Sequence, residues 1–129
     1  MLPLIATAAV IRRGETVLIT RRPEGNSHGG MWEFPGGKLD DYESPQDCLK
    51  RELMEELDLE AIVGPIFEIA YHLYEWGPVL ILAFECQPLS DRIRNVEVSE
   101  HRWVLPREMA QYDILPADRP IIDKLLQIA

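Results

Sequence analysis

The sequence predicts an α/β or α+β sandwich, and three observations support that fold class. Short apolar stretches with the composition of strands are interspersed with two helical patterns, which is typical of a sheet covered by helices. The stretch from Val79 to Cys86 is continuously apolar, as expected for a strand in the interior of a sheet. The 129 residues suit one hydrophobic core, and no repeat or flexible linker divides them. We therefore expect one domain over residues 1–129.

The other strands are expected where apolar or alternating stretches are bounded by turn residues. In chain order these stretches are Leu4 to Ile11, Thr16 to Thr20, Trp32 to Phe34, Ala61 to Ile69 and His101 to Val104. A turn at Gly14-Glu15 joins the first two, and a polar loop over 21–30 precedes the third. Helices are expected from Pro45 to about Leu57 and from about Arg119 to Gln127.

The chain is acidic, with 22 Asp and Glu against 13 Lys and Arg and a formal net charge of -9. This balance disfavours proteins that coat DNA, RNA or anionic membranes, because such proteins rely on clustered positive charge. Taken alone, the charge also argues against a phosphate-bearing partner.

Other features of the sequence favour a cytoplasmic protein. The N-terminus is apolar first and basic second, at Arg12-Arg13, which is the reverse of a secretory signal. No apolar run approaches the ~20 residues of a membrane span. Cys48 and Cys86 form no CxxC pattern and are expected as reduced core thiols.

The first helix has a strong start signal. Ser44 stands at the N-cap, Pro45 at the first helical position and Asp47 at the third, where it can complete a capping-box-like exchange. A stripe with i, i+4, i+8 spacing predicts the face toward the core: Leu49, Leu53 and Leu57.

Beside that stripe, three carboxylates project from one side of the helix: Glu52, Glu55 and Glu56. Like charges at this spacing repel, and they lie in the C-terminal half, near the negative end of the helix dipole. Arg51 is the one cation beside them. Broken local rules without compensation favour a functional site, and clustered hard oxygen ligands suit Mg²⁺ or Mn²⁺. Spacing alone leaves a metal site and a solvated acidic face as equal alternatives.

The residues around this helix resemble a known family. From Gly37 the chain reads Gly, five residues, Glu43, seven residues, and then Arg51-Glu52-Leu53-Met54-Glu55-Glu56-Leu57-Asp58-Leu59. This pattern is similar to the signature box of the Nudix hydrolases, G-x5-E-x7-R-E-U-x-E-E-x-G-U with U an aliphatic residue. One position departs, since Asp58 stands where the family has a glycine that ends the helix in a left-handed conformation. Asp can adopt that conformation at modest cost.

The resemblance implies an α-β-α sandwich with a central mixed sheet, and hydrolysis that depends on Mg²⁺, with Mn²⁺ as a possible substitute. It implies a set of metal-site residues: Gly36, Glu52, Glu55, Glu56 and Glu97. Glu100 is the alternative to Glu97, and a plain surface acid is an equal alternative for that position. Glu43 and Arg51 would complete the catalytic set by orienting the helix and loop, and Glu52 or Glu97 would accept the proton of the attacking water.

Further stretches resemble the MutT and CTP pyrophosphohydrolase branches of the family. Ile19-Thr20-Arg21-Arg22-Pro23 and Trp32 to Lys38 imply phosphate contacts from Arg22, Lys38 and Gly37, against surface cations as the alternative for the first two. Leu115 to Pro120 resembles the segment that reads the nucleobase.

The implied base pocket includes Phe34 and Asp118. Plain core packing is the alternative for Phe34, and an N-cap of the last helix is the alternative for Asp118. An ionised Asp118 would only accept hydrogen bonds and would prefer the exocyclic amine of cytosine, adenine or guanine.

The implied function is a Mg²⁺-dependent nucleoside triphosphate pyrophosphohydrolase, which releases a monophosphate and pyrophosphate. Its substrates would be modified dNTPs such as 8-oxo-dGTP, or CTP and 5-methyl-dCTP. The alternatives are hydrolysis of ADP-ribose or a dinucleoside polyphosphate, and a non-catalytic nucleotide-binding module. Bound metal would reverse the local charge, so acidity argues against long nucleic acid and not against a small nucleotide. The sequence leaves monomer and homodimer equally open.

Overall fold

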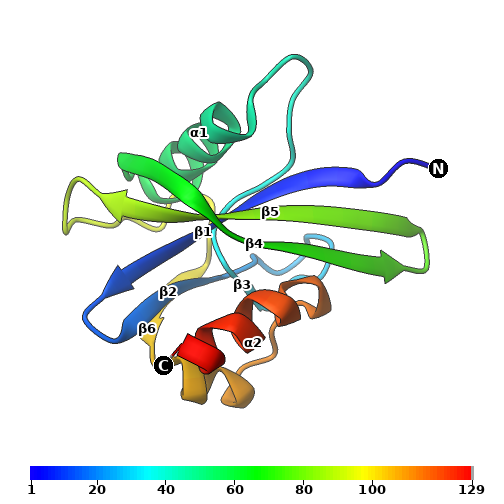
Figure 1. The fold of residues 1–129 in the computed structure, drawn as a ribbon. Helices are drawn as coiled ribbons and strands as arrows, with labels where there is room; N and C mark the ends of the chain where they lie inside the picture. Colours follow the sequence, from blue (N-terminus) through cyan, green and yellow to red (C-terminus); the bar gives the residue numbers. More distant parts are fainter. Residues whose placement is uncertain (129) are drawn as a thin grey trace.

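The computed structural model describes residues 1–128, which form a mixed six-stranded sheet with a helix on each face (Figure 1). The strands are β1 (Leu4–Arg13), β2 (Thr16–Arg21), β3 (Trp32–Glu33), β4 (Ala61–Tyr74), β5 (Gly77–Pro88) and β6 (Glu100–Val104). The helices are α1 (Pro45–Leu57) and α2 (Arg119–Ile128), with 3-10 helices at Pro106–Gln111 and Pro116–Asp118. The expected mixed sheet and flanking helices are confirmed.

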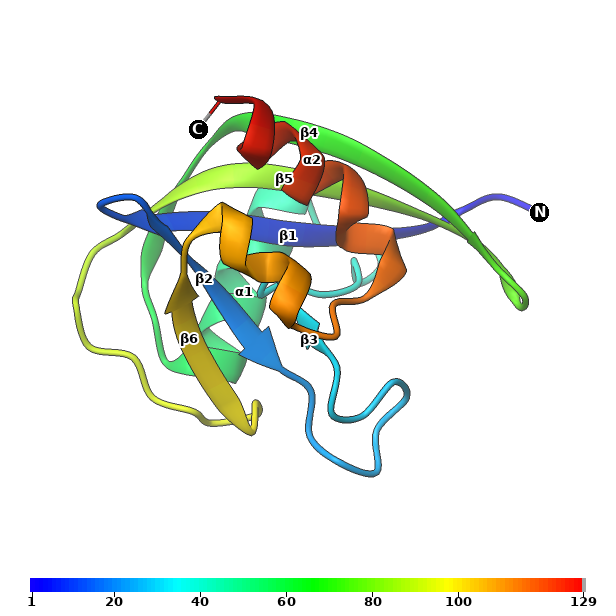
Figure 2. The ribbon, with the colours of Figure 1, turned by 90° about the horizontal axis from the view of Figure 1, so that it is seen from below.

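The sheet has the strand order β3-β2-β1-β5-β4, with β6 paired to β2. β1 and β5 run parallel from Leu4↔Val79 to Ile11↔Cys86, while the other pairs are antiparallel. β1 and β2 pair only near their hairpin, at Arg12↔Val17 and Arg13↔Thr16, and then splay apart (Figure 2). The splayed strands leave room for the segment 34–39 to run along β1.

The core divides into two clusters, one on each face of the sheet. The stripe Leu49, Leu53 and Leu57 of α1 is fully buried and packs against one face. On the other face, the inward residues of β5 meet α2 through Ile121, Ile122 and Leu125. The predicted face of α1 therefore buries its apolar stripe, as the 3.6-residue period requires, and α2 buries an apolar face in the same way.

Both predicted ends of α1 are confirmed. Ser44 Oγ accepts a hydrogen bond from the Asp47 amide at 3.1 Å, with Pro45 at the first helical position. At the other end Asp58 is left-handed, with φ 51° and ψ 42°, and its N–H points to the Leu53 and Met54 carbonyls. Asp58 therefore takes the conformation that the family glycine would supply.

Two expected strand ends near the site are wrong, and two short helices were not expected. β3 ends at Glu33, because the Phe34 amide donates to Asp118 and not to a neighbouring strand. β4 continues past Ile69 to Tyr74, since its ladder with β5 runs to the hairpin at Gly77. Neither 3-10 helix is expected from the sequence.

No helix in the described part of the chain is long and apolar enough to cross a membrane.

Candidate active site

The loop before α1 lies against both β1 and the helix. The Thr7 amide donates to the Gly37 carbonyl at 2.8 Å, so the loop follows β1 at close range. A Cβ on Gly36 would lie 2.8 Å from the Thr7 carbonyl carbon, and φ at Gly36 is 153°. A Cβ on Gly37 would lie 2.6 and 2.7 Å from the carboxylate oxygens of Glu52. Backbone contact therefore requires glycine at position 36, while a side chain at position 37 would push against the Glu52 carboxylate.

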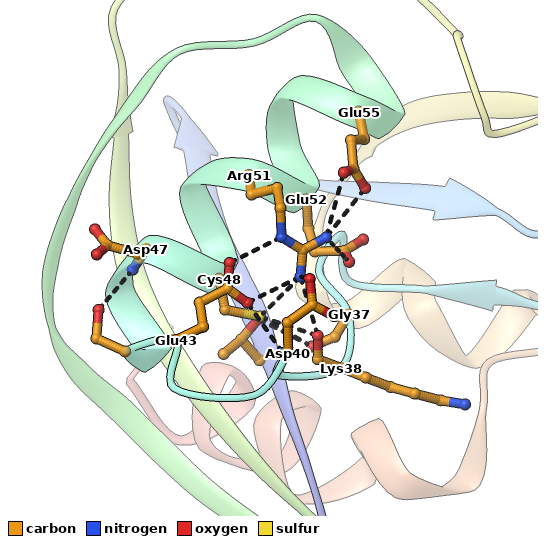
Figure 3. Close-up of polar contacts among 11 residues, drawn as sticks. Gly37, Lys38, Asp40, Glu43, Asp47, Cys48, Arg51, Glu52 and Glu55 are labelled. Atoms are coloured by element: carbon orange, nitrogen blue, oxygen red, sulfur yellow. Dashed lines mark hydrogen bonds and ion pairs between the residues drawn. The ribbon is translucent and has the colours of Figure 1, made fainter.

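Arg51 joins this loop to the helix (Figure 3). Its guanidinium forms a two-point contact with Glu43, Nε to Oε2 at 2.8 Å and Nη2 to Oε1 at 3.0 Å. Nη1 lies 2.8 Å from Glu52 and 3.2 Å from Glu55, while Nη2 donates to the Lys38 carbonyl at 3.2 Å. The hydrogen bond from Arg51 lowers the pKa of Glu43 to about 2. Arg51 thereby links a loop, the neighbouring carboxylates and the helix in one network.

An acidic cavity of about 400 Å³ lies beside the helix. Its carboxylates come from α1, from β3, from the loop before α1 and from the segment before β6: Glu33, Glu52, Glu56, Glu97 and Asp40. Burial raises the pKa of Glu56 to about 9, and the charges of Glu33 and Glu52 raise it further, against a hydrogen bond from the Gly36 amide at 3.1 Å. Burial also raises the pKa of Glu52. The ionised form of these carboxyl groups is therefore unfavourable unless a cation binds among them.

Two of the implied residues do not line this cavity. Glu55 is half exposed and turns toward Arg51, so it lies at the rim. Glu100 pairs with Arg102 at 2.7 Å and lies 3.9 Å from Arg21. The backbone of Glu97, by contrast, is fixed to the Glu56 carbonyl at 3.2 Å and its side chain lines the cavity. The structure therefore favours Glu97 over Glu100 for the implied outside carboxylate.

The cavity has the donor set that a hard divalent cation prefers. Carboxylates of Glu52, Glu56 and Glu97 share one wall, and the repulsion among them is relieved by positive charge. In residues 1–128, no group of three or more His, Cys, Asp and Glu side chains is arranged to hold a metal ion as it stands. The chemistry of the residues, with several carboxylates lining one cavity, nevertheless fits a divalent cation.

A second cavity of about 400 Å³ adjoins the first. Its apolar and aromatic walls come from β1, β5 and the β4–β5 hairpin, and include Phe34, Tyr74 and Trp76. The rings of Tyr74 and Trp76 are stacked, with centroids 5.5 Å apart and an interplanar angle of 12°. A cavity of this size with stacked rings beside polar side chains suits a planar ring system with polar edges.

Asp118 lies at the inner end of the second cavity and is 4% exposed. Its Oδ2 accepts a hydrogen bond from the Phe34 amide at 3.0 Å. Burial raises the pKa of Asp118 to about 8, with the charge of Glu33 as the next cause. With a pKa of about 8 the carboxyl holds its proton near pH 7, so the structure does not favour the ionised, accept-only Asp118 considered from the sequence. A neutral acid can donate as well as accept.

The alternatives for Phe34 and Asp118 are decided by geometry. Phe34 is 2% exposed and belongs to the core, and it also forms a wall of the second cavity. Asp118 directly precedes α2, yet among residues 1–128 its carboxylate bonds to Phe34 and to no amide of the first turn of α2. The N-cap interpretation of Asp118 is therefore not supported.

Arg22 and Lys38 line both cavities, where they could bind anionic groups. Arg22 is held by Glu33, with Nη1 3.0 and 3.2 Å from the two carboxylate oxygens, and by the Ser27 carbonyl, 2.7 Å from Nε. Arg22 is therefore not a free surface charge, whereas the side chain of Lys38 is exposed and the surface-cation alternative stays open for it.

Sequence reasoning missed Glu33, Tyr74 and Trp76. The alternation of Trp32, Glu33 and Phe34 was the one available signal, because it places Glu33 opposite two core residues. The two aromatic residues lie beyond the expected end of β4, at Ile69, so the sequence did not relate them to the cavity.

A comparison with protein families shows which family this chain belongs to. Residues 2–125 match the model of the NUDIX domain. The chain belongs to the NUDIX family. It is a Nudix hydrolase, and the resemblance of its signature box, from Gly37 to Leu59, is confirmed at the level of the family.

The relatives of this chain include a CTP pyrophosphohydrolase and an 8-oxo-dGTP diphosphatase. The chain is 35% identical over 124 residues to "CTP pyrophosphohydrolase" of Escherichia coli (strain K12), which covers 94% of this chain and 90% of that protein. It is 33% identical over 128 residues to "8-oxo-dGTP diphosphatase" of Haemophilus influenzae, over 95% of this chain and 92% of that protein.

Solved Nudix structures have the same fold. The solution structure of the E. coli ORF135 protein superposes with a TM-score of 0.81 at 31% identity, over 99% of this chain and 91% of that one. The crystal structure of a MutT protein from Methanosarcina mazei Go1 superposes with a TM-score of 0.86 over 98% and 95% of the two chains. Its identity is 23%, so that likeness concerns the fold alone.

Proposed function

We propose that this Nudix hydrolase cleaves nucleoside triphosphates, with Mg²⁺ bound, into a nucleoside monophosphate and pyrophosphate. One observation carries the proposal: a cavity with aromatic walls and one buried acid adjoins a cavity with clustered carboxylates and two cations. A base fits the first and a metal-bound polyphosphate fits the second. The names of the relatives support the same reaction.

The carboxylates of Glu52, Glu56 and Glu97, with the Gly36 carbonyl, would hold Mg²⁺, or Mn²⁺ in its place, and Glu55 would join them from the rim. When bound, the metal supplies positive charge to the phosphate oxygens and lowers the pKa of a bound water. Glu52 or Glu97 would accept the proton of the attacking water. Arg51 and Glu43 would keep the helix and glycine loop in register, since Arg51 bonds both.

The phosphates would be held by Arg22, Lys38 and the Gly37 amide. Arg22 is already oriented by Glu33 and Ser27, so less side-chain entropy is lost when it binds an anion. A linear arrangement of water, β-phosphorus and the leaving group requires this fixed placement, because phosphoryl transfer depends on positioning and electrostatics.

The base would lie between Phe34 and the Tyr74–Trp76 stack, with its polar edge at Asp118. A neutral Asp118 can pair with an edge that both donates and accepts, which cytosine and 8-oxoguanine each offer. The proposed substrates are CTP, 5-methyl-dCTP and 8-oxo-dGTP, drawn from the free nucleotide pool of the cytoplasm. Long nucleic acid and membranes are not proposed partners.

The test is ³¹P NMR of the products from a panel of CTP, 5-methyl-dCTP, dGTP, 8-oxo-dGTP and ADP-ribose. Each nucleotide is incubated with about 5 equivalents of Mg²⁺, at a Mg²⁺ concentration on the order of millimolar. We expect pyrophosphate and a monophosphate from at least one triphosphate, and no turnover when EDTA replaces Mg²⁺. Release of orthophosphate with a diphosphate would contradict the proposed bond cleavage. Cleavage of ADP-ribose alone would favour the alternative substrate class.

A further inference from the structure

The two cavities of the candidate site share a wall. Five residues line both cavities: Arg22, Glu33, Gly36, Gly37 and Lys38. A nucleotide with its base beside Asp118 and its phosphates beside Glu52 must carry its sugar across this wall, because the sugar connects the two groups. The inference that follows rests on the proposed function.

Glu33 is the one side chain in this wall that can accept a hydrogen bond. Arg22 and Lys38 carry only N–H donors, and the two glycines have no side chain. The Glu33 side chain is 17% exposed, so its carboxylate has lost most of its water. A hydroxyl that reaches it would replace a lost hydrogen bond at a largely buried acceptor.

The carboxylate of Glu33 is held in place by Arg22, but not all of its hydrogen-bond acceptor sites are occupied. Arg22 Nη1 lies 3.0 Å from one oxygen and 3.2 Å from the other. A carboxylate has about four lone-pair sites, so this single donor nitrogen leaves several of them available. The anchored geometry means that the acceptor is oriented before a ligand arrives.

We propose that Glu33 accepts a hydrogen bond from a hydroxyl of the nucleotide sugar and thereby selects among sugars. The sugar hydroxyl would supply the hydrogen bond that burial denies to the Glu33 carboxyl oxygens from water. A site built to bond a hydroxyl rejects the analogue that lacks it, because the buried acceptor then has no replacement partner. The 2′- and 3′-hydroxyls share this chemistry, and the experiment distinguishes them.

The experiment is isothermal titration of the whole protein with the product nucleotides CMP, 2′-deoxy-CMP and 3′-deoxy-CMP. A parallel series uses GMP and its two deoxy analogues, so that base preference does not hide the effect of the sugar. We expect the wild-type protein to bind one deoxy analogue about tenfold more weakly than the parent nucleotide. The analogue that binds weakly identifies the hydroxyl.

Two variants assign this preference to the carboxylate. Glu33→Ala should bring the affinity ratio to within about twofold of one, and Glu33→Gln, which keeps the shape without the charge, should lower it to an intermediate value. Lys38→Met, which leaves Glu33 and its contact with Arg22 in place, should weaken all nucleotides while the sugar ratio stays near that of the wild type.

Two results overturn the inference: equal wild-type affinities for all three sugars, or an unchanged ratio in Glu33→Ala. In either case Glu33 serves only to orient Arg22. The failure of the proposed function has a different signature. If the protein cleaves triphosphates but does not discriminate between sugars, the proposed function stands and the inference about Glu33 fails. If the protein discriminates between sugars but cleaves no triphosphate, the proposed function fails.

Discussion

Gly37 lies directly against the carboxylate of Glu52, so that a Cβ at position 37 would come within 2.6 Å of Glu52 Oε2. The glycine loop and the Glu52 carboxylate are therefore in close contact, with no room for a side chain at position 37 as they stand. Any side chain at position 37 would displace the carboxylate from the acidic cavity.

We expect Gly37→Ala to lower kcat at least about tenfold, because a displacement of about 1 Å at a reacting centre has a large effect on rate. Gly14→Ala is the matched control. Its Cβ would meet nothing within 4 Å, but its φ of +58° is left-handed. That control should lose about 1 kcal/mol of unfolding free energy and keep its activity. Full activity in Gly37→Ala would show that Glu52 does not need this position.

Glu97 and Glu100 offer a second matched pair, three residues apart. Glu97 lines the acidic cavity, whereas Glu100 pairs with Arg102. We expect Glu97→Gln to reduce kcat by roughly 10²-fold or more, as for loss of a metal ligand or general base. Glu100→Gln should stay within about twofold of wild type, because exposed ion pairs contribute little. Steady-state rates at saturating Mg²⁺ measure both variants. A larger loss of kcat in Glu100→Gln than in Glu97→Gln would assign the role of the carboxylate outside the signature box to Glu100.

Asp118 should make stability depend on pH. Its pKa is raised by burial to about 8, while that of the unfolded chain stays near 3.8. Between these values the folded protein holds a proton that the unfolded chain releases, so the free energy of unfolding falls as pH rises through this window. Asp118→Asn removes this titration. We expect the variant to match wild type at pH 4 and to exceed it by at least about 1 kcal/mol at pH 8.5.

Urea unfolding at several pH values measures this difference. Asp123→Asn is the control, because Asp123 is half exposed on α2 and pairs with Arg119 at 3.2 Å. Its stability should follow that of wild type across the whole range. Parallel curves for Asp118→Asn and wild type would mean that Asp118 is ionised in the folded protein.

Asp58 departs from the family glycine but takes the left-handed conformation of the helix C-cap. We expect Asp58→Gly to raise the unfolding free energy by about 0.5 kcal/mol, since glycine adopts this conformation without strain. Asp58→Ala should lower it by about 1 kcal/mol.

The ion pair of Asp58 with Arg94, at 3.3 Å, is lost in both variants. Arg94→Ala measures that contribution separately, and thermal unfolding gives all three values. A destabilised Asp58→Gly together with an equally destabilised Arg94→Ala would attribute the effect to the ion pair.

Several features of this protein could be predicted from the sequence because they depend on near neighbours. Ser44 and Asp47 are three residues apart and cap the helix, and the stripe from Leu49 to Leu57 repeats at helical spacing. Arg51 meets Glu43 across a short loop of the same stretch. Such interactions follow from local geometry, which the chain encodes over a few residues.

Other features required the assembled sheet. The Phe34 amide meets Asp118 across 84 residues of chain, and that contact ends β3 early. The true end of β4 was set by its ladder with β5, not by its own pattern. The ionisation of Asp118 also depends on burial, which no local pattern of residues reveals.

The sequence by itself determined the family, the helix with its carboxylates and the residues that could meet a metal and phosphates. Only the tertiary structure decided that Glu97 and not Glu100 lines the acidic cavity, and that Glu33 stands between two cavities. The physical reason is the splaying of β1 and β2, which lets the loop at 34–39 enter between strands and bring distant segments to one wall.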